Sequence, residues 1–264
     1  MYKLGILGIG NMGGSILEGI LKASIYQKEE ILLYDVNSDI VSKYTNMGMS
    51  FAKDEKDLVE NVRMLLLAIK PQMLDELKKY EFNTEGIVII SIVAGKTKEK
   101  LEEIFGKQKY VRVMPNTPSL IKYGATAIAK EETLTKEEFE VVVNIFKAIG
   151  HVEVISDDLM NEVIPLNGSM PAFLYYFAKC FIDKGVKDGL DYATAKNLAC
   201  EAIIGSAKMI LESDKDIDTL IKNVCSPKGA TLEGLKVFEK NKTKEVIESV
   251  SDATIKRAYE LLNI

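Results

Sequence analysis

The stretch that decides the fold is Tyr2-Lys3-Leu4-Gly5-Ile6-Leu7-Gly8-Ile9-Gly10-Asn11-Met12-Gly13-Gly14. Its apolar run, Leu4 to Leu7, predicts a buried parallel strand. A helical pattern follows and continues to Lys22. The pattern G-x-G-x-x-G, with its glycines at positions 8, 10 and 13, stands between the two elements, as a dinucleotide-binding turn requires.

Each glycine of this turn has a physical role. Gly8 permits the tight turn out of the strand, Gly10 lets the backbone approach a pyrophosphate, and Gly13 lets the helix lie close to the strand. The helix N-terminus offers free N–H groups to the same anion. Asp35 ends the next strand-like run, Ile31 to Tyr34, at about the 20-residue distance that the motif needs.

Composition limits the remaining possibilities. The chain has 264 residues, of which 47% are hydrophobic and 28% charged, so it has room for two domains with a real core. Its formal net charge is −5 with no basic block, so we expect no nucleic-acid partner. We also expect no membrane partner, no signal peptide and no metal site. The three cysteines lack both metal-ligand spacing and a disulfide framework, and favour a cytoplasmic protein.

The first half of the chain alternates strand and helix. This order predicts a doubly wound, Rossmann-type α/β sheet in a dinucleotide-binding domain over residues 1–155. The expected strands are Leu4–Leu7, Ile31–Tyr34, Met64–Ile69, Ile87–Ile92, Tyr110–Val113, Ala125–Ala129 and Val152–Ile155. The expected helices are 38–47, 55–61 with Asp54 as its cap, and one opened by the capping box Thr135 to Glu138 and ending at Ile149.

Ligands of such sheets bind beyond the carboxyl ends of the strands. The segments there are Ala68 to Pro71, Val93 to Gly95, and Met114-Pro115-Asn116-Thr117-Pro118. The last segment is rich in turn formers, and is equally compatible with a structural loop and with a binding loop.

The second half, residues 156–264, is predicted to be all helical. Asp157 to about Lys184 is expected to form one long helix disturbed by three residues, Pro165, Gly168 and Pro171. Further helices are expected at 192–211 with Asp191 as cap, 216–223, 232–240 and 244–262. The turn Ser226 to Thr231 would place the N–H groups of Gly229, Ala230 and Thr231 at a helix start, where they can hold a small carboxylate. The Thr231 hydroxyl would either cap that helix or face a ligand.

The chain resembles the pyrroline-5-carboxylate reductases over almost its whole length. The resemblance rests on these stretches: Gly8–Gly13, Ala68–Pro71, Ser91–Gly95, Arg112–Pro118, Gly124–Thr126, Gly168–Ala172 and Val224–Thr231, followed by Gly234-Leu235. It implies a Rossmann domain followed by an all-helical dimerisation domain, with the active site shared between paired subunits. It also implies hydride transfer from NADH or NADPH to the C=N carbon of 1-pyrroline-5-carboxylate, which forms L-proline.

The resemblance also assigns residues. Thr231 is the expected catalytic residue, through a contact with the ring nitrogen. The expected substrate-binding residues are Asn223, Ser226, Gly229, Ala230 and Thr231. The expected cofactor-binding residues are Leu7, Gly8, Ile9, Gly10, Asn11, Met12, Gly13, Asp35, Ala68, Ile69, Lys70, Pro71, Ile92, Val93, Ala94 and Asn116. Met170 and Lys228 stand where the family usually has glycine, which leaves room for altered substrate preference.

Three further expectations follow. Asp35 and the absence of a nearby cation favour NADH over NADPH. The crowded aromatics of Phe173 to Phe177 and the small residues of 192–211 predict a homodimer, and the resemblance adds that dimers can gather into a ring. Two alternatives stay open: a reductase of the β-hydroxyacid dehydrogenase-like group, and a non-catalytic nucleotide-sensing relative.

Overall fold

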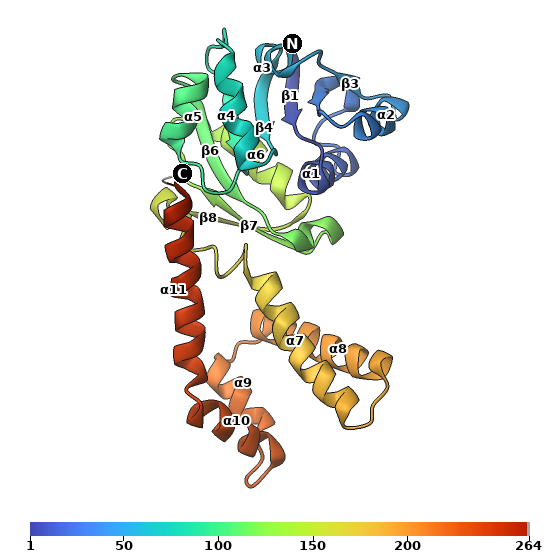
Figure 1. Ribbon diagram of the computed structural model, residues 1–264, viewed down its shortest axis with the longest axis vertical. Helices are drawn as coiled ribbons and strands as arrows, with labels where there is room; N and C mark the ends of the chain where they lie inside the picture. Colours follow the sequence, from blue (N-terminus) through green and yellow to red (C-terminus); the bar gives the residue numbers. More distant parts are fainter. Residues whose placement is uncertain (263–264) are drawn as a thin grey trace. The chain divides into compact units, whose positions relative to one another are not determined.

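The structure, a computed structural model, describes residues 1–262, and these form two compact units (Figure 1). The first unit is Met1–Pro171 together with the chain from Ile255 onward, and the second is Ala172–Thr254. No helix within residues 1–262 combines the length and the apolar composition needed to cross a membrane.

An eight-stranded sheet forms the centre of the first unit, in the order β3-β2-β1-β4-β5-β6-β7-β8. The strands are β1 Tyr2–Leu7, β2 Ile31–Tyr34, β3 Ser50–Phe51, β4 Val62–Leu67, β5 Val88–Ser91, β6 Lys109–Met114, β7 Gly124–Ala129 and β8 Gly150–Ile155. All neighbours are parallel except β6 and β7, which are antiparallel. The chain order reverses between β1 and β4, and such a switch point is where open α/β sheets bind ligands.

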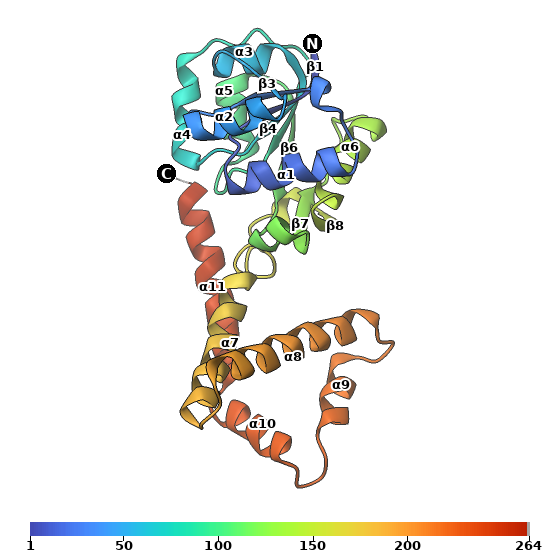
Figure 2. The same ribbon diagram turned by 90° about the vertical axis from the view of Figure 1, so that its right-hand side faces the viewer.

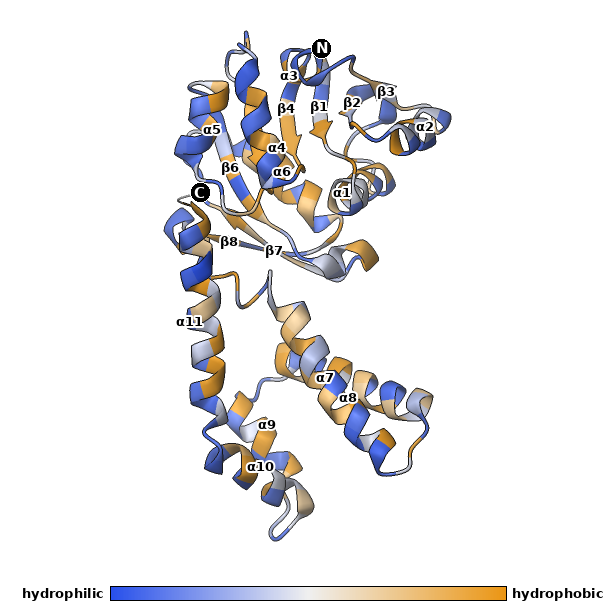
Figure 3. Ribbon diagram, viewed as in Figure 1, coloured by the Kyte–Doolittle hydropathy of each residue, from blue (hydrophilic) through white to orange (hydrophobic). Residues whose placement is uncertain are grey.

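Helices cover both faces of this sheet (Figure 2). The helices of the first half are α1 Asn11–Lys22, α2 Ser38–Asn46, α3 Glu55–Glu60, α4 Pro71–Asp75, α5 Lys98–Phe105 and α6 Lys136–Lys147. Apolar side chains of α1, α2 and α6 pack on one face of the sheet, while those of α3, α4 and α5 pack on the other. The strands β1 and β4 are buried on both faces, which explains their continuous apolar runs (Figure 3).

The structure confirms the predicted doubly wound fold and every predicted strand to within two or three residues. Local caps also form as predicted: Asp54 accepts the Asp57 N–H, and Thr135 and Glu138 make a capping box. The sequence did not predict α4, α5 or β3. Of these, α5 buries Leu101, Ile104 and Phe105 beneath a surface of lysine and glutamate, so its apolar signal is short.

One prediction is wrong: residues 157–184 are not one long helix. A single 3-10 turn, Asp157–Leu159, is followed by irregular turns, and α7 begins only at Met170. Pro165 lacks a backbone donor. In addition, the buried Asn167 side chain donates to the carbonyl of Met114, which holds this segment on the sheet in a non-helical path.

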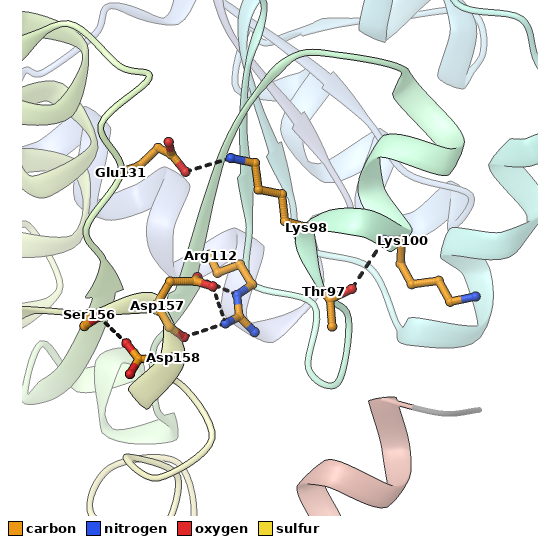
Figure 4. A network of polar contacts seen from close by, with 8 residues as sticks. All are labelled: Thr97, Lys98, Lys100, Arg112, Glu131, Ser156, Asp157 and Asp158. Carbon is orange, nitrogen blue, oxygen red and sulfur yellow. Dashed lines mark hydrogen bonds and ion pairs between the residues drawn. The ribbon is translucent and has the colours of Figure 1, made fainter.

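The same segment belongs to the first unit. Arg112 on β6 donates from its guanidinium to both carboxylate oxygens of Asp157, at 2.7 Å each, and to the Asp157 carbonyl (Figure 4). Met160 packs against Ala127 and Ala129 of β7. The compact units therefore divide at Pro171, later than the expected boundary after residue 155.

The second unit is entirely helical. Its helices are α7 Met170–Lys187, α8 Tyr192–Glu212, α9 Ile217–Val224, α10 Ala230–Lys240 and the first part of α11 Thr243–Leu262. Asp191 and Asp216 cap α8 and α9, as the sequence predicted for Asp191. Within residues 172–254, Ile182 and Ala195 are the only apolar residues that are buried. This unit therefore has almost no core of its own.

Candidate functional site

The glycine turn after β1 is fixed by the packing of the protein itself at two positions. Gly8 has a φ of +90°, and a Cβ there would lie 2.7 Å from the Ala68 carbonyl oxygen. A Cβ on Gly13 would lie 2.1 Å from the Gly8 carbonyl oxygen. Contacts this short are impossible without moving backbone, so the strand, the turn and α1 require glycine at both positions.

Gly10 is different, because nothing inside the protein requires it. Its φ is −68°, which any residue adopts, and no atom of residues 1–262 lies within 4 Å of a Cβ built on it. Gly10 is the N-cap of α1, and no side chain caps this helix. The turn thus leaves open space in front of uncapped N–H groups, which fits the close approach of a pyrophosphate.

Asp35 follows β2 and holds the same turn. Its Oδ2 accepts the Ile9 N–H at 2.6 Å, and its Oδ1 accepts the Asn37 N–H at 2.8 Å. The sequence predicted Asp35 as a ribose ligand, but it did not predict this second role. Since each carboxylate oxygen has two lone pairs, the group keeps acceptor capacity for hydroxyl donors.

A cavity of about 330 Å³ lies at the carboxyl ends of β1, β2 and β4. Among the predicted cofactor residues, it is lined by Leu7, Gly8, Gly10, Asp35, Ala68, Ile69 and Lys70. A second hollow of about 310 Å³ shares Gly10 and adds Ile9 and Asn11. The structure therefore brings together residues from three separate strand ends that the sequence could only place on one edge.

The cavity wall also contains residues that the sequence reasoning missed. Tyr34, Glu55 and Glu76 line it together with Asp35 and a single lysine, Lys70. Partial burial, and then the nearby Glu55 carboxylate, raise the pKa of Tyr34 above its ordinary value, so this phenol stays neutral. Glu55 accepts a hydrogen bond of 2.8 Å from the Tyr80 hydroxyl. The only feature of the sequence that pointed to Tyr34 was its position at the end of a predicted strand, on the edge of the sheet where ligands bind.

The other predicted cofactor residues have different surroundings. The Ile92 N–H donates to the Leu67 carbonyl, so Ile92 lies next to the end of β4, and Val93 and Ala94 belong to the loop that follows. Met12 packs into the core on the α1 face of the sheet, and Pro71 opens α4. Their roles as cofactor contacts stay predictions.

Asn116 has a clear structural role. It is buried, its Oδ1 accepts the Ala125 N–H at 2.9 Å, and its amide donates to the Asn167 carbonyl at 3.2 Å. The amide therefore ties the end of β6 to β7 and to the segment before α7. Its predicted contact with the cofactor has no support from these hydrogen bonds and remains a prediction.

The predicted substrate turn lies in the second unit, whereas the predicted cofactor residues lie in the first. The Gly229 N–H donates to the Ser226 carbonyl at 2.9 Å, with Pro227 and Lys228 between them. Lys228 has a φ of +61°, so the four residues have the pattern of a type II turn, which favours glycine at that third position. The turn therefore accounts for the glycine that the resemblance leads us to expect here, whereas Lys228 adopts the same positive φ with a side chain.

Gly229 is the N-cap of α10, and two expectations change as a result. Its N–H is taken by the turn and is not free for a ligand, contrary to prediction. Thr231 lies inside the first helical turn and not at the N-cap, so its hydroxyl does not take the capping position. Ala230 and Thr231 retain helix-start N–H groups, and the side chains of Thr231, Asn223 and Ser226 are exposed.

A mostly parallel sheet with an open glycine turn at its switch point, and an acidic residue after β2, defines a Rossmann-type dinucleotide-binding protein. The comparisons with known proteins agree. The family described as "Pyrroline-5-carboxylate reductase dimerisation" matches residues 157–261, and "NADP oxidoreductase coenzyme F420-dependent" matches residues 3–95.

Individual relatives cover the chain almost completely. Pyrroline-5-carboxylate reductase of Aquifex aeolicus is 34% identical over 264 residues, which is 98% of this chain and 97% of the relative. The crystal structure of 1-pyrroline-5-carboxylate reductase from Streptococcus pyogenes has a TM-score of 0.87 at 27% identity, covering 98% of both chains. That of Plasmodium falciparum pyrroline carboxylate reductase with NADP bound has a TM-score of 0.85 at 30% identity, covering 99% of this chain and 98% of the other.

The chain belongs to the pyrroline-5-carboxylate reductase family. This agrees with the resemblance seen in its motifs, and it decides against the β-hydroxyacid dehydrogenase-like alternative.

Proposed function

We propose that this protein reduces 1-pyrroline-5-carboxylate to L-proline with NADH or NADPH. Family membership supplies the reaction, and the open approach above Gly10 is the structural observation that supports a bound dinucleotide. When bound, the reduced nicotinamide supplies a hydride to the C=N carbon. The remaining work of the protein is positioning and charge stabilisation.

Different parts of the chain bind the dinucleotide and the substrate. The uncapped start of α1 and the turn Gly8–Gly13 hold the pyrophosphate, and Asp35 accepts from ribose hydroxyls. At the start of α10, the N–H groups of Ala230 and Thr231 bind the substrate carboxylate, and the Thr231 hydroxyl bonds to the ring nitrogen. Asn223 and Ser226 flank this helix start. We assign cofactor binding to residues 1–155, and dimerisation with substrate binding to 156–264.

An assay of NAD(P)H oxidation with 1-pyrroline-5-carboxylate tests this function directly. We expect turnover that depends on both reactants and produces proline. Dinucleotide binding without turnover would instead support the non-catalytic, nucleotide-sensing alternative. The scattered cysteines favour a reducing compartment, and we place this reaction in the cytoplasm.

We expect NADH to be used at least as well as NADPH. The cavity beside the ribose position contains three carboxylates, those of Asp35, Glu55 and Glu76, and one lysine, Lys70. This excess of negative charge repels a 2′-phosphate, whereas Asp35 accepts from a 2′-hydroxyl. Steady-state kcat/KM values for the two cofactors measure the preference, and a strong NADPH preference would refute this expectation.

A variant tests the charge of Asp35. Asp35→Asn removes the negative charge and keeps one oxygen, which can accept the Ile9 N–H, while the hydrogen bond from the Asn37 N–H is lost. We expect it to shift the ratio of kcat/KM values toward NADPH by about tenfold. Asp39→Asn, on an exposed residue of α2, is the matched control and should leave the ratio unchanged.

The protein is expected to be an obligate homo-oligomer built from dimers through its helical part. Large apolar side chains are exposed along the helices of the second unit, among them Tyr176 at 74% and Leu211 at 84%. Soluble monomers rarely leave apolar surface of this extent uncovered. A second copy with the same helices would cover it, and dimers would then be able to assemble into a ring.

Light scattering at micromolar concentration tests this expectation. The measured mass should be at least twice the 29.4 kDa of one chain. Tyr176→Lys places a charge on the exposed face of α7 and should lower the measured mass, whereas Lys187→Gln on the same helix should not. A stable and fully active monomer would contradict the proposed assembly.

A further inference from the structure

The C-terminal end of α11 packs against the loop that follows β5. From Ile255 onward this helix belongs to the first unit. A Cβ built on Gly95 would lie 3.4 Å from the Cβ of Leu261, which is ordinary van der Waals contact. Val93, Gly95 and Leu262 line one small cavity of about 20 Å³, together with residues of β6 and the segment before α7.

A hydrogen bond fixes this helix end. The Tyr259 hydroxyl donates to Glu162 Oε1 at 2.6 Å. This hydrogen bond is the main reason why the pKa of Tyr259 is raised, so the phenol stays neutral and remains a donor. The second oxygen of Glu162 is buried and has no hydrogen-bond partner among the described residues. Loss of the Tyr259 hydroxyl would therefore leave a poorly satisfied carboxylate in this place.

The loop Val93–Gly95 follows β5, and β5 pairs with β4, the strand that leads into the proposed dinucleotide cavity. The Ile92 N–H donates to the carbonyl of Leu67, whose strand continues into the cavity residues Ala68 to Lys70. Just beyond the loop, Lys96 pairs with Asp75 of α4 at 3.3 Å. Gly95 has a φ of +68°, so the loop makes a sharp turn that α11 supports from behind.

We propose that the last turn of α11 positions the loop Val93–Gly95 for dinucleotide binding, and that Tyr259 is the positioning residue. The hydrogen bond to Glu162 holds the helix end, and the Cβ and main chain of Leu261 lie opposite the open side of Gly95. The role rests on the dinucleotide site proposed above. Neither Tyr259 nor Leu261 is among the residues predicted to touch the cofactor.

Binding of NADH, measured by its fluorescence without the imine, tests the proposal on the full chain. In Tyr259→Phe we expect the dissociation constant to rise about three- to tenfold, the scale of one hydrogen bond. Leu261→Gly removes the Cβ that lies nearest to Gly95 and leaves the hydrogen bond of Tyr259, and it should weaken NADH binding similarly. Glu162→Gln keeps an acceptor and should stay close to the unchanged protein. Tyr123→Phe, on a side chain that is 75% exposed, is the control for the hydroxyl deletion.

The kinetics separate positioning from general destabilisation. We expect the KM for the dinucleotide to rise in Tyr259→Phe while the KM for the imine and kcat stay within about twofold. An unchanged NADH affinity in both Tyr259→Phe and Leu261→Gly would overturn the proposal, even if their melting temperatures fell. If the unchanged protein bound no dinucleotide, the proposed function itself would fail, and this role with it.

Discussion

Thr231→Ala is expected to fold normally and to lose reductase activity by about tenfold to a thousandfold, the scale of one hydrogen bond made in the transition state. Folding should be unaffected because Thr231 is exposed in the first turn of α10 and does not occupy its N-cap. The loss is expected mainly in kcat, since the helix-start N–H groups that bind the substrate carboxylate remain.

Two variants make this result specific. Thr231→Ser keeps the hydroxyl and should retain much more activity than the alanine variant. Thr243→Ala removes the threonine at the first position of α11 and should keep full activity. Circular dichroism and the melting temperature verify the fold of each variant. Full activity in Thr231→Ala would exclude the proposed catalytic contact.

The second large effect is expected from a pair of substitutions in the glycine turn. Gly10→Val should leave the melting temperature nearly unchanged, because no atom lies within 4 Å of its Cβ and its φ suits any residue. The added side chain would occupy the space in front of α1 where the pyrophosphate is proposed to lie. We therefore expect the dissociation constant for NADH to rise about a hundredfold or more, the loss of a set of charge-assisted hydrogen bonds.

Gly13→Ala is the matched variant in the same turn, and here we expect a loss of stability. Its Cβ would lie 2.1 Å from the Gly8 carbonyl oxygen, so α1 has to move away from β1. Overpacking of this kind costs about 1–3 kcal/mol or more, and the melting temperature should fall by several degrees. Calorimetry and NADH titration of both variants test the assignment. If Gly10→Val bound NADH as tightly as the unchanged protein, the pyrophosphate would not lie on this turn.

The sequence by itself determined the features that depend on near neighbours. The run Leu4–Leu7 and the spacing of its glycines predicted β1, the turn and α1, because a buried strand and a tight turn restrict residue type locally. Asp54, Thr135 and Asp191 were placed correctly as caps, since a cap bonds to N–H groups only a few residues away. These local signals, in order, were enough for the doubly wound fold.

Part of the candidate site was also predictable. Strand ends share one edge of a parallel sheet, so Gly8, Asp35 and Ala68 were expected near one another, and they line a single cavity. Asp35 illustrates the limit of this reasoning. Its hydrogen bond to the Ile9 N–H joins residues far apart in sequence, and no local pattern indicates it.

Only the tertiary structure decided the features set by distant partners. The expected helix through residues 157–184 fails because Arg112 and Met114 on β6 hold Asp157 and Asn167 in a different path. The β6–β7 pair is antiparallel, and the end of α11 lies against Gly95; neither follows from periodicity. Helical propensity is worth only tenths of a kcal/mol per residue, so long-range hydrogen bonds and packing override it.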